Sequence, residues 1–416
     1  MIIYKMMDQE TARKLLVEGG TFVFLGVPEE TQFGIDMQCW NTEEDFRGIK
    51  MIPPGLHYIH YSAVSKGTGD VSPRSGFMHY FQQKEFVVKM WDKKAEDISK
   101  EEISDESIQR LKDNLFNIDK HLAPYPYEIW QKWKLLTTHI TAELAAKLSP
   151  ECGIIRSAVE LMSMTDEERP RGAKGKVPEQ MESQEENSEE SPPPSDPQEG
   201  CSTSGQSDAK RFKRLSNEEK LNAMLPDLKP TPGTSLRFTE IPRDKFPPGS
   251  TPEEITKHYL DQSYTLELMI AEHEEPLHIV GELQFAYLCF LIGHSLDAFE
   301  HWKNLVILFC SCDDALNNHK NLFFHFVKTL ESQIDEMPEE FLADIVMNKN
   351  LVYKKLREFF RTVYTSNIEG RFLNLINDFK HGLTEKFQWD FTELDADEDD
   401  ERPVVVKLAE SVDEGV

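Results

Sequence analysis

The sequence has little positive charge for its size. Its 416 residues include 46 Lys and Arg against 74 Asp and Glu, which gives a net charge of -28 at pH 7. Binding to a nucleic-acid backbone requires concentrated Lys and Arg, and an acidic chain repels polyanions. We therefore expect no direct contact with nucleic acid, and any role near RNA should act through a protein partner.

Cysteine is scarce, and long hydrophobic runs are lacking. None of the six cysteines forms a Cys-x-x-Cys pair, and Cys310-Ser-Cys312 has no nearby partners to complete a zinc site. This scatter argues against a disulfide framework and favours a reducing compartment. The longest apolar run, FAYLCFLI at 285–292, is far too short to span a bilayer. The N-terminus shows no signal peptide. These features predict a cytoplasmic protein without a membrane anchor, and one that can also shuttle to the nucleus.

The first part of the chain is rich in strand-forming residues. Short apolar or aromatic stretches predict strands at 21–27, 55–62, 76–82 and 85–92, and the last two should form a hairpin. Pro53-Pro54-Gly55 predicts a sharp turn in which Gly55 has positive φ. Apolar residues at helical spacing then predict helices at 108–122 and 129–144 that pack on the sheet. The expected first domain, 1–164, is an antiparallel β-sandwich-like domain with packed helices.

Residues 165–215 are almost free of apolar side chains and are rich in Ser, Glu and Pro. Such a segment cannot repay the entropy lost on ordering, so we predict a disordered linker. It can serve as a plain tether or carry regulation, because Ser183 precedes Glu186 by three residues and Ser191 precedes a proline. We therefore name Ser183 and Ser191 as possible phosphorylation sites. The basic cluster 210–214 is either an import signal or simply solvated.

The region 216–391 is predicted to be α-helical after a short extended segment at 236–242. Thr251 is a helix cap, Pro252 suits the first turn, and Glu254 completes a capping box. One apolar face continues to Ile270, and Ser295 should cap a second helix. Further helices are expected at 281–293, 295–311, 313–334, 338–347, 350–364 and 367–386. With the acidic tail 392–416, the fold class is α+β with two domains.

No catalytic signature stands out. The sequence around Gly293-His294-Ser295 suggests a nucleophile elbow, but Asp297 replaces the second glycine and the context is helix to helix. His57 and His60 lie three apart on a strand, so they should face opposite sides and cannot readily share a metal. We interpret them as half-buried strand histidines. The sequence therefore predicts a non-enzymatic protein with no catalytic residue, metal or cofactor.

Several blocks, in order along the chain, carry a family resemblance. They are GIDMQCW (34–40), FRGIKMIPPGLHYIHYS (46–62), PYPYEIWQKW (124–133), TPEEITKHYLDQSYTLE (251–267), GELQFAYLCFLIGHSLDAFEHWKNL (281–305) and KFQWDF (386–391) followed by PVVV. Together they resemble the A1-alpha-2-repression splicing-factor family, whose members are assembly factors of the U-five small nuclear ribonucleoprotein. The linker has no counterpart in the resemblance.

The resemblance implies a β-sandwich-like first domain and a second domain like the VHS fold. It also implies a partner, the large scaffold protein of that particle, bound through its RNase H-like and Jab/MPN-like domains. Members of the family hold this scaffold in a cytoplasmic precursor and keep the particle's helicase from docking prematurely. The alternative class is a VHS-like trafficking adaptor, against which the β-rich first domain and the quoted blocks argue.

The tail raises a question of its own. A β-forming peptide, PVVVKL, follows seven acidic residues in the nine positions 393–401. Such a peptide can add to an exposed sheet edge of a partner. Val404 and Val406 would then face one way, and Val405 and Lys407 the other. We therefore predict that Val404, Val405, Val406, Lys407 and Leu408 bind the partner. The alternative is a plain solubilising tail. Phe387, Trp389 and Phe391 either clamp the tail's root onto the helical domain or anchor an interface, and we favour the clamp.

Overall fold

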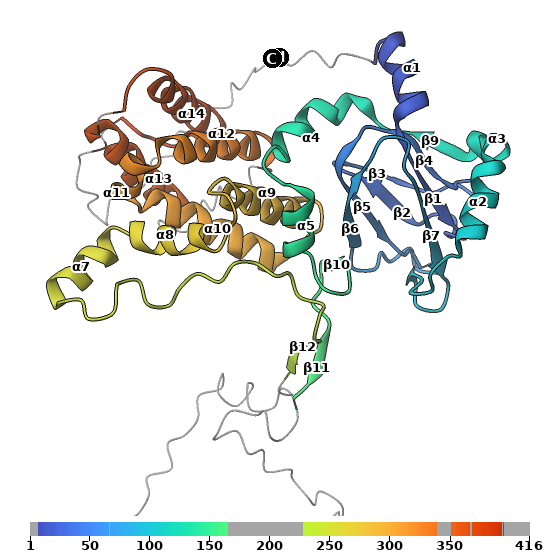
Figure 1. The fold of residues 1–416 in the computed structure, drawn as a ribbon, viewed down its shortest axis with the longest axis horizontal. Helices are drawn as coiled ribbons and strands as arrows, with labels where there is room; N and C mark the ends of the chain where they lie inside the picture. The colour runs from blue at the N-terminus through green and yellow to red at the C-terminus, as the bar shows by residue number, and fades with distance from the viewer. Residues whose placement is uncertain are drawn as a thin grey trace, which may run out of the picture. The chain divides into compact units, whose positions relative to one another are not determined.

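The computed structural model describes residues 7–65, 67–164, 228–338, 351–366, 368–392 and 394. The chain divides into two compact units, 1–159 with 232–416 and, separately, 160–231. An N-terminal β-sheet region with some helices precedes an all-helical region, which confirms the predicted fold class (Figure 1). The predicted linker 165–215 lies outside the described residues, as does the predicted tail except for Thr392 and Leu394. The domain boundaries and the VHS likeness stay predictions.

Two five-stranded sheets form the N-terminal region. The first has the order β8–β7–β1–β4–β9, with bounds Asp97–Ile98, Phe86–Asp92, Gly20–Leu25, Gly48–Ile52 and Leu122–Pro124. The second has the order β10–β6–β5–β2–β3, with bounds Ile155–Arg156, Ser75–Phe81, Gly55–Ser62, Gln32–Ile35 and Gln38–Asn41. The predicted strand 76–82 corresponds to β6, and 85–92 to β7.

Aromatic side chains fill the space between the two sheets. Phe22 of β1 and Phe33 of β2 stack with ring centroids 6.1 Å apart, and Phe24 of β1 lies 5.9 Å from Tyr61 of β5. Phe22, Phe24 and Phe33 are wholly excluded from solvent. Because each pair joins one sheet to the other, the sandwich predicted from the aromatic-rich strands is confirmed.

The predicted hairpin between β6 and β7 is wrong. β6 pairs with β5 in the second sheet, whereas β7 pairs in parallel with β1 in the first. The connection leaves the second sheet where the Glu85 carboxylate accepts a hydrogen bond from the Gln82 N–H at 2.6 Å, and Lys84 has a φ of 57°. A short polar turn in the sequence shows that the chain reverses but does not show which strands pair. The first sheet is therefore mixed and not purely antiparallel.

The helices of this region are shorter than predicted. α1 (Gln9–Glu18) precedes the first strand, and the predicted helix 108–122 divides into α2 (Asp105–Asp113), α3 (Leu115–Ile118) and a 3-10 turn, η1 (Asp119–His121). The predicted helix 129–144 likewise divides into α4 (Trp130–Leu136), after the turn η2 (Tyr127–Ile129), and α5 (Ala142–Leu148). Thr141 caps α5 by accepting from the Leu144 N–H, so the capping residue ends the continuous helix that apolar spacing suggested.

The second region is built of helices. They are α7 (Pro252–Leu260), α8 (Ser263–Ala271), α9 (His278–Leu291), α10 (Leu296–Cys310), α11 (Asp313–Asn318), α12 (Lys320–Glu336), α13 (Leu351–Thr365) and α14 (Arg371–Phe387). The capping box at Thr251 and the cap at Ser295 are confirmed. The helix expected from Thr251 to Ile270 breaks at Asp261, and 313–334 breaks at His319. The predicted helix 338–347 lies outside the described residues except for its first residue.

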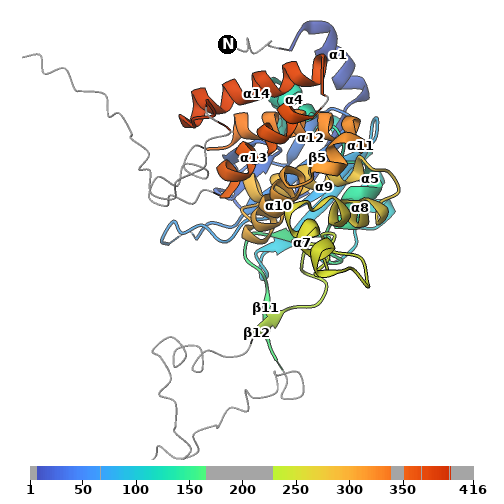
Figure 2. The ribbon, with the colours of Figure 1, turned by 90° about the vertical axis from the view of Figure 1, so that its left-hand side faces the viewer.

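Helix α9 joins the two regions. α5 contacts α9 and α4 contacts α12, and both pairs lie side by side in the two ribbon views (Figures 1 and 2). The Gln284 side chain accepts from the His139 N–H at 2.8 Å and donates to the Leu135 carbonyl at 3.0 Å. From the sheet side, Arg74 donates to the Ile292 carbonyl at 2.8 Å. The sheets and the helices therefore share one buried boundary.

In the smaller unit, β11 (Leu161–Ser163) pairs antiparallel with β12 (Leu228–Pro230). The backbone N–H of Thr231 also donates to the Glu160 carbonyl at 2.7 Å. Ser163 and Leu228 are therefore paired across this short two-stranded sheet.

The boundary at α9 can be tested with a pair of glycines. A Cβ on Gly281 would lie 2.3 Å from the His139 carbonyl and 2.6 Å from a Leu144 methyl, whereas a Cβ on Gly382 of α14 meets nothing within 4 Å. Gly281→Ala should lower the free energy of unfolding by about 1–3 kcal/mol through overpacking. Gly382→Ala should raise it by about 1 kcal/mol through helix propensity. Urea unfolding measures both, and equal effects would contradict the close packing at α9.

Candidate partner-binding site

The structure describes three of the predicted partner-binding residues. Phe387 ends α14, and Trp389 and Phe391 follow it. Val404, Val405, Val406, Lys407 and Leu408 lie outside the described residues, as do Ser183 and Ser191. Their predicted roles in binding and phosphorylation stay predictions.

The three described aromatic residues fold back onto α13 and α14. Gln388 has left-handed backbone angles, which end α14 and reverse the chain. Phe387 and Trp389 then stack with ring centroids 4.9 Å apart. Phe391 is 3% exposed, and its ring lies 5.1 Å from Phe360. These residues pack as the clamp interpretation predicts, so most of their surface is used within the chain. We call Phe387, Trp389 and Phe391 the aromatic clamp.

Polar side chains of α13 fasten the backbone that follows. Tyr353 donates its hydroxyl to the Asp390 carbonyl at 2.6 Å, and Arg357 donates to the same oxygen at 2.8 Å. Arg361 donates to the Leu394 carbonyl at 2.8 Å. Two hydrogen bonds from Thr392 lower the pKa of the Asp390 carboxyl. The bond from the Thr392 hydroxyl has the larger effect, and the bond from its N–H has the smaller one. The chain is thus held up to Leu394, the root of the tail.

Sequence reasoning missed the residues of α13 that hold this root. Tyr353, Arg357 and Arg361 are spaced four apart, so they lie on one face of the helix. That spacing was available in the sequence. Its target was not, because the acceptors are backbone carbonyls of a segment with no regular structure. The three side chains thus fix the backbone at Asp390 and at Leu394.

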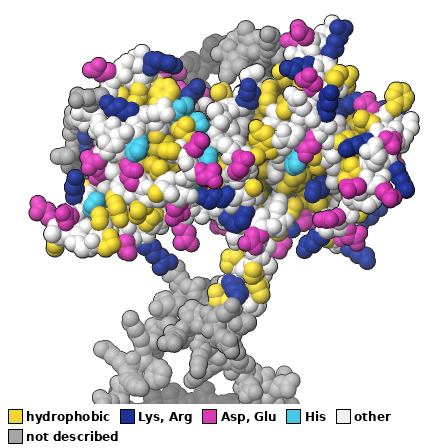
Figure 3. Space-filling model, in the orientation of Figure 1, with side chains coloured by type: hydrophobic (Ala, Val, Ile, Leu, Met, Phe, Trp, Pro, Cys, Tyr) yellow, Lys and Arg dark blue, Asp and Glu magenta, His cyan; other side chains and the backbone are white. Residues whose placement is uncertain are grey.

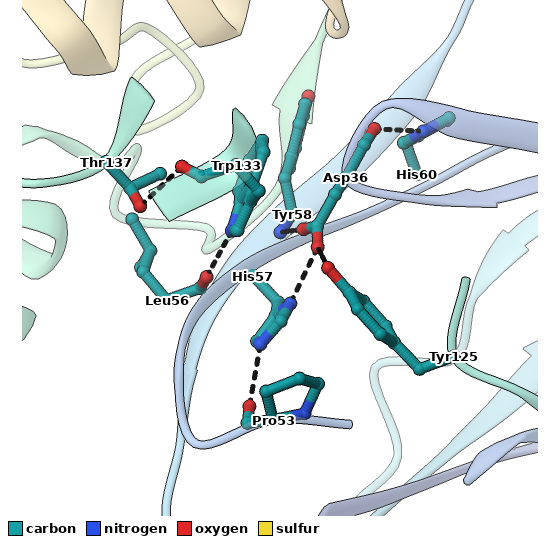
Figure 4. A network of polar contacts seen from close by, with 9 residues as sticks. All are labelled: Asp36, Pro53, Leu56, His57, Tyr58, His60, Tyr125, Trp133 and Thr137. Carbon is teal, nitrogen blue, oxygen red and sulfur yellow. Dashed lines mark hydrogen bonds and ion pairs between the residues drawn. The ribbon is translucent and has the colours of Figure 1, made fainter. Parts of the chain in front are cut away.

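A buried polar network in the β region has the composition of a catalytic site, and it serves a different purpose (Figure 4). The Asp36 carboxylate accepts from the Tyr125 hydroxyl at 2.6 Å and from the Tyr58 N–H at 3.0 Å, and it meets His57 Nδ1 at 2.7 Å. The other ring nitrogen of His57 meets the Pro53 carbonyl at 2.7 Å. Both nitrogens of His57 are therefore used, and Asp36 and His57 are wholly buried.

This network positions the turn and the strands around it. It ties Pro53, at the predicted turn where Gly55 has the expected positive φ of 135°, to the β2–β3 connection. His57 and His60 are buried, not half-buried as we predicted. Burial, which has the largest effect, and the positive charge of Arg74 lower the pKa of His60 to about 3. Burial, which has the largest effect, and the negative charge of the Asp36 carboxylate raise the pKa of Tyr125. Groups so enclosed have no access to a substrate, and we interpret them as structural.

A second buried network surrounds Glu282 on α9. Its carboxylate accepts from the Thr239 N–H at 2.7 Å and from His301 Nε2 at 2.8 Å, and His273 Nε2 lies 3.3 Å away. Burial alone would raise the pKa of Glu282, but hydrogen bonds from both histidines and from Thr239 lower it to about 2. The network fastens the segment around Thr239 to α9 and α10.

The remaining candidate chemistry is weak. Burial raises the pKa of the Cys310 and Cys312 thiols, and in the described part of the chain no three His, Cys, Asp or Glu side chains are placed to hold a metal ion. None of the described helices has the length and apolar character that crossing a membrane requires. On the face drawn in Figure 3, basic and acidic side chains are interspersed. Charge alone therefore marks no site on that face.

Comparison with known proteins gives a consistent result over nearly the whole chain. A family model described as the AAR2 N-terminal domain matches residues 18–150, and one described as the AAR2 C-terminal repeat region matches residues 238–392. "Protein AAR2 homolog" of Homo sapiens is 35% identical over 412 residues, covering 98% of this chain and 99% of that protein. The homolog of Mus musculus is 34% identical over 410 residues, with 98% of each chain covered. The homolog of Caenorhabditis elegans is 33% identical over 381 residues, which covers 90% of this chain and 95% of that protein.

The aromatic clamp can be tested with two phenylalanines of opposite exposure. Phe391 is 3% exposed and Phe116 of α3 is 91% exposed. Phe391→Ala should lower the free energy of unfolding by about 3–5 kcal/mol, because it removes a packed ring. Phe116→Ala should change it by less than about 0.5 kcal/mol. Chemical denaturation measures both, and a Phe391→Ala variant as stable as Phe116→Ala would refute the clamp.

The Glu282 network predicts a defined pH dependence. Because the pKa falls from 4.5 to about 2 on folding, the stabilisation is complete above pH 4.5 and is lost as the pH falls toward 2. Glu282→Gln should therefore cost on the order of 3 kcal/mol at pH 7, and the cost should shrink at pH 3. Urea unfolding at both pH values tests this. The exposed Glu274→Gln serves as control, and a cost for Glu282→Gln that stays constant with pH would contradict the assignment.

Proposed function

The chain belongs to the AAR2 family, and from that membership we propose that it is a non-enzymatic assembly factor of the U-five small nuclear ribonucleoprotein in pre-mRNA splicing. It binds the large scaffold protein of this particle through the scaffold's RNase H-like and Jab/MPN-like domains. By occupying the scaffold, it delays docking of the particle's helicase. It acts in the cytoplasm on the precursor particle and can shuttle to the nucleus.

The observation that carries this proposal is the fixed root of the tail. Four hydrogen bonds, one each from Tyr353 and Arg357 and two from Arg361, hold the backbone up to Leu394, and the Phe391 ring is buried. A tail that only kept the protein soluble would not need a clamped root. A tail that must deliver a strand to a partner does, because the anchor fixes the point from which the strand is presented.

Covalent geometry limits where the strand can act. Eight residues lie between Leu394 and Pro403, so nine residue-to-residue steps join them, and an extended chain spans at most about 3.3–3.6 Å per residue. The peptide beginning at Pro403 must therefore bind within about 30 Å of Leu394. A partner domain docked beside α13 and α14 fulfils this condition, and a remote domain does not.

The strand by itself is a weak ligand. Burying two valine side chains contributes roughly 1.5–3 kcal/mol each, and ordering each residue costs about 1–2 kcal/mol. Over a peptide of five or six residues the ordering cost, about 5–12 kcal/mol, outweighs the roughly 3–6 kcal/mol from the two valines. The strand contributes when the folded regions are already docked, because the second contact then forms at a high effective concentration. The acidic run 393–401 would mainly speed the encounter with a basic surface.

Release requires a way to loosen this grip. We propose phosphorylation of Ser183 or Ser191 as a trigger, since each phosphate adds close to two negative charges and can reorganise the linker. If phosphomimetic replacement of both serines leaves the stability of the complex unchanged, the linker is a tether only.

The function is tested by binding to a scaffold fragment that carries both domains. Deleting residues 393–416 should weaken binding about 100-fold, because the second point of contact is lost. A full chain in which 402–408 is scrambled serves as the matched control for charge and length, and it should bind like the deletion. Calorimetry or surface plasmon resonance measures both. Unchanged affinity after deletion would eliminate the two-point grip, and no binding of the intact chain at micromolar concentration would eliminate the proposed partner.

A further inference from the structure

A groove with a volume of about 550 Å³ lies between β6 and α5. Met78 and Tyr80 of β6 line one side of it, and three alanines of α5 line the other. The alanines are Ala142, Ala145 and Ala146. Their small side chains leave open space beside the strand, and Tyr80 is 41% exposed. The second half of β6 is therefore accessible from the groove.

The outer side of β6 is unpaired over most of its length. β10 pairs only with the first two residues of the strand. Before β10 the chain turns away at Gly153, which has a φ of 72° and donates its N–H to the Pro150 carbonyl. Among the described residues, no strand pairs with this side of β6 from Phe77 to Phe81.

The backbone groups of Met78 and Tyr80 point outward from the sheet. Tyr58 of β5 lies opposite Met78, and it directs its own N–H and carbonyl to Asp36, away from β6. In an antiparallel pair, opposite residues alternate between those that hydrogen-bond to each other and those that do not. Met78 therefore turns its N–H and carbonyl to the open side, and so does Tyr80, two residues on. No hydrogen bond from any described residue reaches these four groups.

This edge lacks the usual protection against strand pairing. Natural proteins protect exposed edges with Lys, with Pro, with a bulge or with a covering element. The β6 sequence, SGFMHYF, contains neither Lys nor Pro, and the strand pairs with β5 without a register shift along its whole length. Helix α5 lies beside the edge but leaves the groove open. The edge is thus able to accept a further strand.

The charge that the groove leaves unpaired is negative. Arg237 donates to the Ser149 carbonyl at 2.6 Å and to the Ala146 carbonyl, so its guanidinium is used at the last turn of α5. His79 already meets a carboxylate at 2.9 Å. Glu151 lines the groove and is exposed, and no described side chain pairs with its carboxylate. A positively charged group is therefore the complement that this end of the groove lacks.

We propose that the groove binds an extended peptide segment of another protein, added antiparallel to β6 as a further strand of the second sheet. Unpaired backbone groups beside an apolar floor are what β-strand addition requires. The bound segment carries small apolar residues at two alternate positions, which hydrogen-bond to Tyr80 and Met78. A Lys or Arg follows the second of them and meets Glu151.

The positions in the segment follow from sheet geometry. Residues directly opposite each other share a face of the sheet, so the two apolar residues direct their side chains to the alanines of α5. The residue between them faces the other side. An antiparallel segment passes Tyr80 first and Met78 second, and it leaves the edge near Gly153, where β10 begins. Glu151 is two residues from Gly153 and lines the same groove, so the next residue of the segment is placed beside its carboxylate.

A segment of a partner protein is favoured over a second copy of this chain. A net charge of -28 opposes the approach of two copies. A segment that carries Lys or Arg is instead attracted to the acidic chain, and Glu151 gives this attraction a fixed position in the groove.

The first test observes the edge directly by nuclear magnetic resonance. The full chain is labelled with ¹⁵N at methionine and tyrosine, so that the amides of Met78 and Tyr80 report on binding. The probe is a capped peptide, TVTVK, whose two valines would lie opposite these residues. Both signals should shift saturably with a dissociation constant on the order of 1 mM, because one short strand binds weakly. Absence of a saturable shift up to about 10 mM peptide overturns the proposal.

Two methylated peptides distinguish an added strand from general apolar contact. N-methylation of both valines removes the N–H groups that face Tyr80 and Met78, and it should abolish binding. N-methylation of the threonine between them removes an N–H that faces away from β6, and the affinity should stay within about threefold of the unmodified peptide. Equal affinity of the two methylated peptides overturns the added strand.

Matched variants of the full chain locate the site. Tyr80→Pro removes the outward N–H and should abolish the shift at Met78, whereas Tyr80→Ala keeps this N–H and should retain the shift. Ala146→Trp fills the groove and should abolish binding, whereas Glu143→Trp adds the same bulk to a residue of α5 that does not line the groove. Thermal unfolding checks that all four variants are folded. Binding that survives Tyr80→Pro and Ala146→Trp overturns the site.

An exchange of charge tests the basic residue of the segment. At low salt, Glu151→Lys should weaken binding of TVTVK about threefold and strengthen binding of TVTVE by a similar factor, as expected for an exposed ion pair. The same resonance titration measures both peptides on both chains. A ratio of the two affinities that does not change between the natural chain and Glu151→Lys overturns the assignment of the basic residue.

The other possible occupants are tested with the same chain. The natural chain should be a monomer in sedimentation velocity at 10 and 100 µM, and a chain without residues 393–416 should bind TVTVK with the natural affinity. A dimer that Tyr80→Pro dissolves would assign the groove to a second copy, and binding that appears only after the truncation would assign it to the chain's own tail. Either result overturns the partner segment. The inference does not rest on the proposed function, because these assays contain no scaffold protein.

Discussion

Helix α9 imposes the constraint on which the rest of the protein depends. Of its 14 residues, all but His278 and Leu291 are buried, so each polar group on it needs a partner inside the protein. Gln284 finds two in the backbone, the Leu135 carbonyl of α4 and the His139 N–H that follows α4, and Glu282 finds its partners in Thr239 and His301. The buried polar side chains of α9 can all form hydrogen bonds only when the β region, the segment around Thr239 and the other helices are in place. The β region and the helical region consequently form one body.

The fixed arrangement of the β region and the helical region matters for the proposed function, because a protein that acts by occupying its partner must hold its contact points at fixed distances from one another. The aromatic clamp and the face of α13 hold the chain up to Leu394, and eight residues lie between this point and Pro403. In the proposed function, the tail is presented to the partner from this one fixed point. In that proposal, a peptide too weak to bind alone adds a second contact once the folded regions are docked.

The sequence was sufficient where local chemistry decides the structure. The capping box at Thr251, the cap at Ser295 and the positive φ of Gly55 were predicted and are confirmed. Prediction failed where the partner of an element lies far away in the chain. The β6–β7 connection looks like a hairpin turn but joins two sheets, and apolar spacing across Thr137–Thr141 concealed the break between α4 and α5. At the candidate site, the three aromatic residues were recognisable from their alternation. Tyr353, Arg357 and Arg361 were not, because they bind backbone oxygens.

The central claim is that this protein works by gripping a larger protein at more than one point. The most direct measurement compares the affinity of the full chain for a scaffold fragment carrying both the RNase H-like and the Jab/MPN-like domains with its affinity for each domain alone. The account predicts that the two-domain fragment binds at least about 100-fold more tightly than the better single domain. Equal affinity for the two-domain fragment and one of its domains would contradict it.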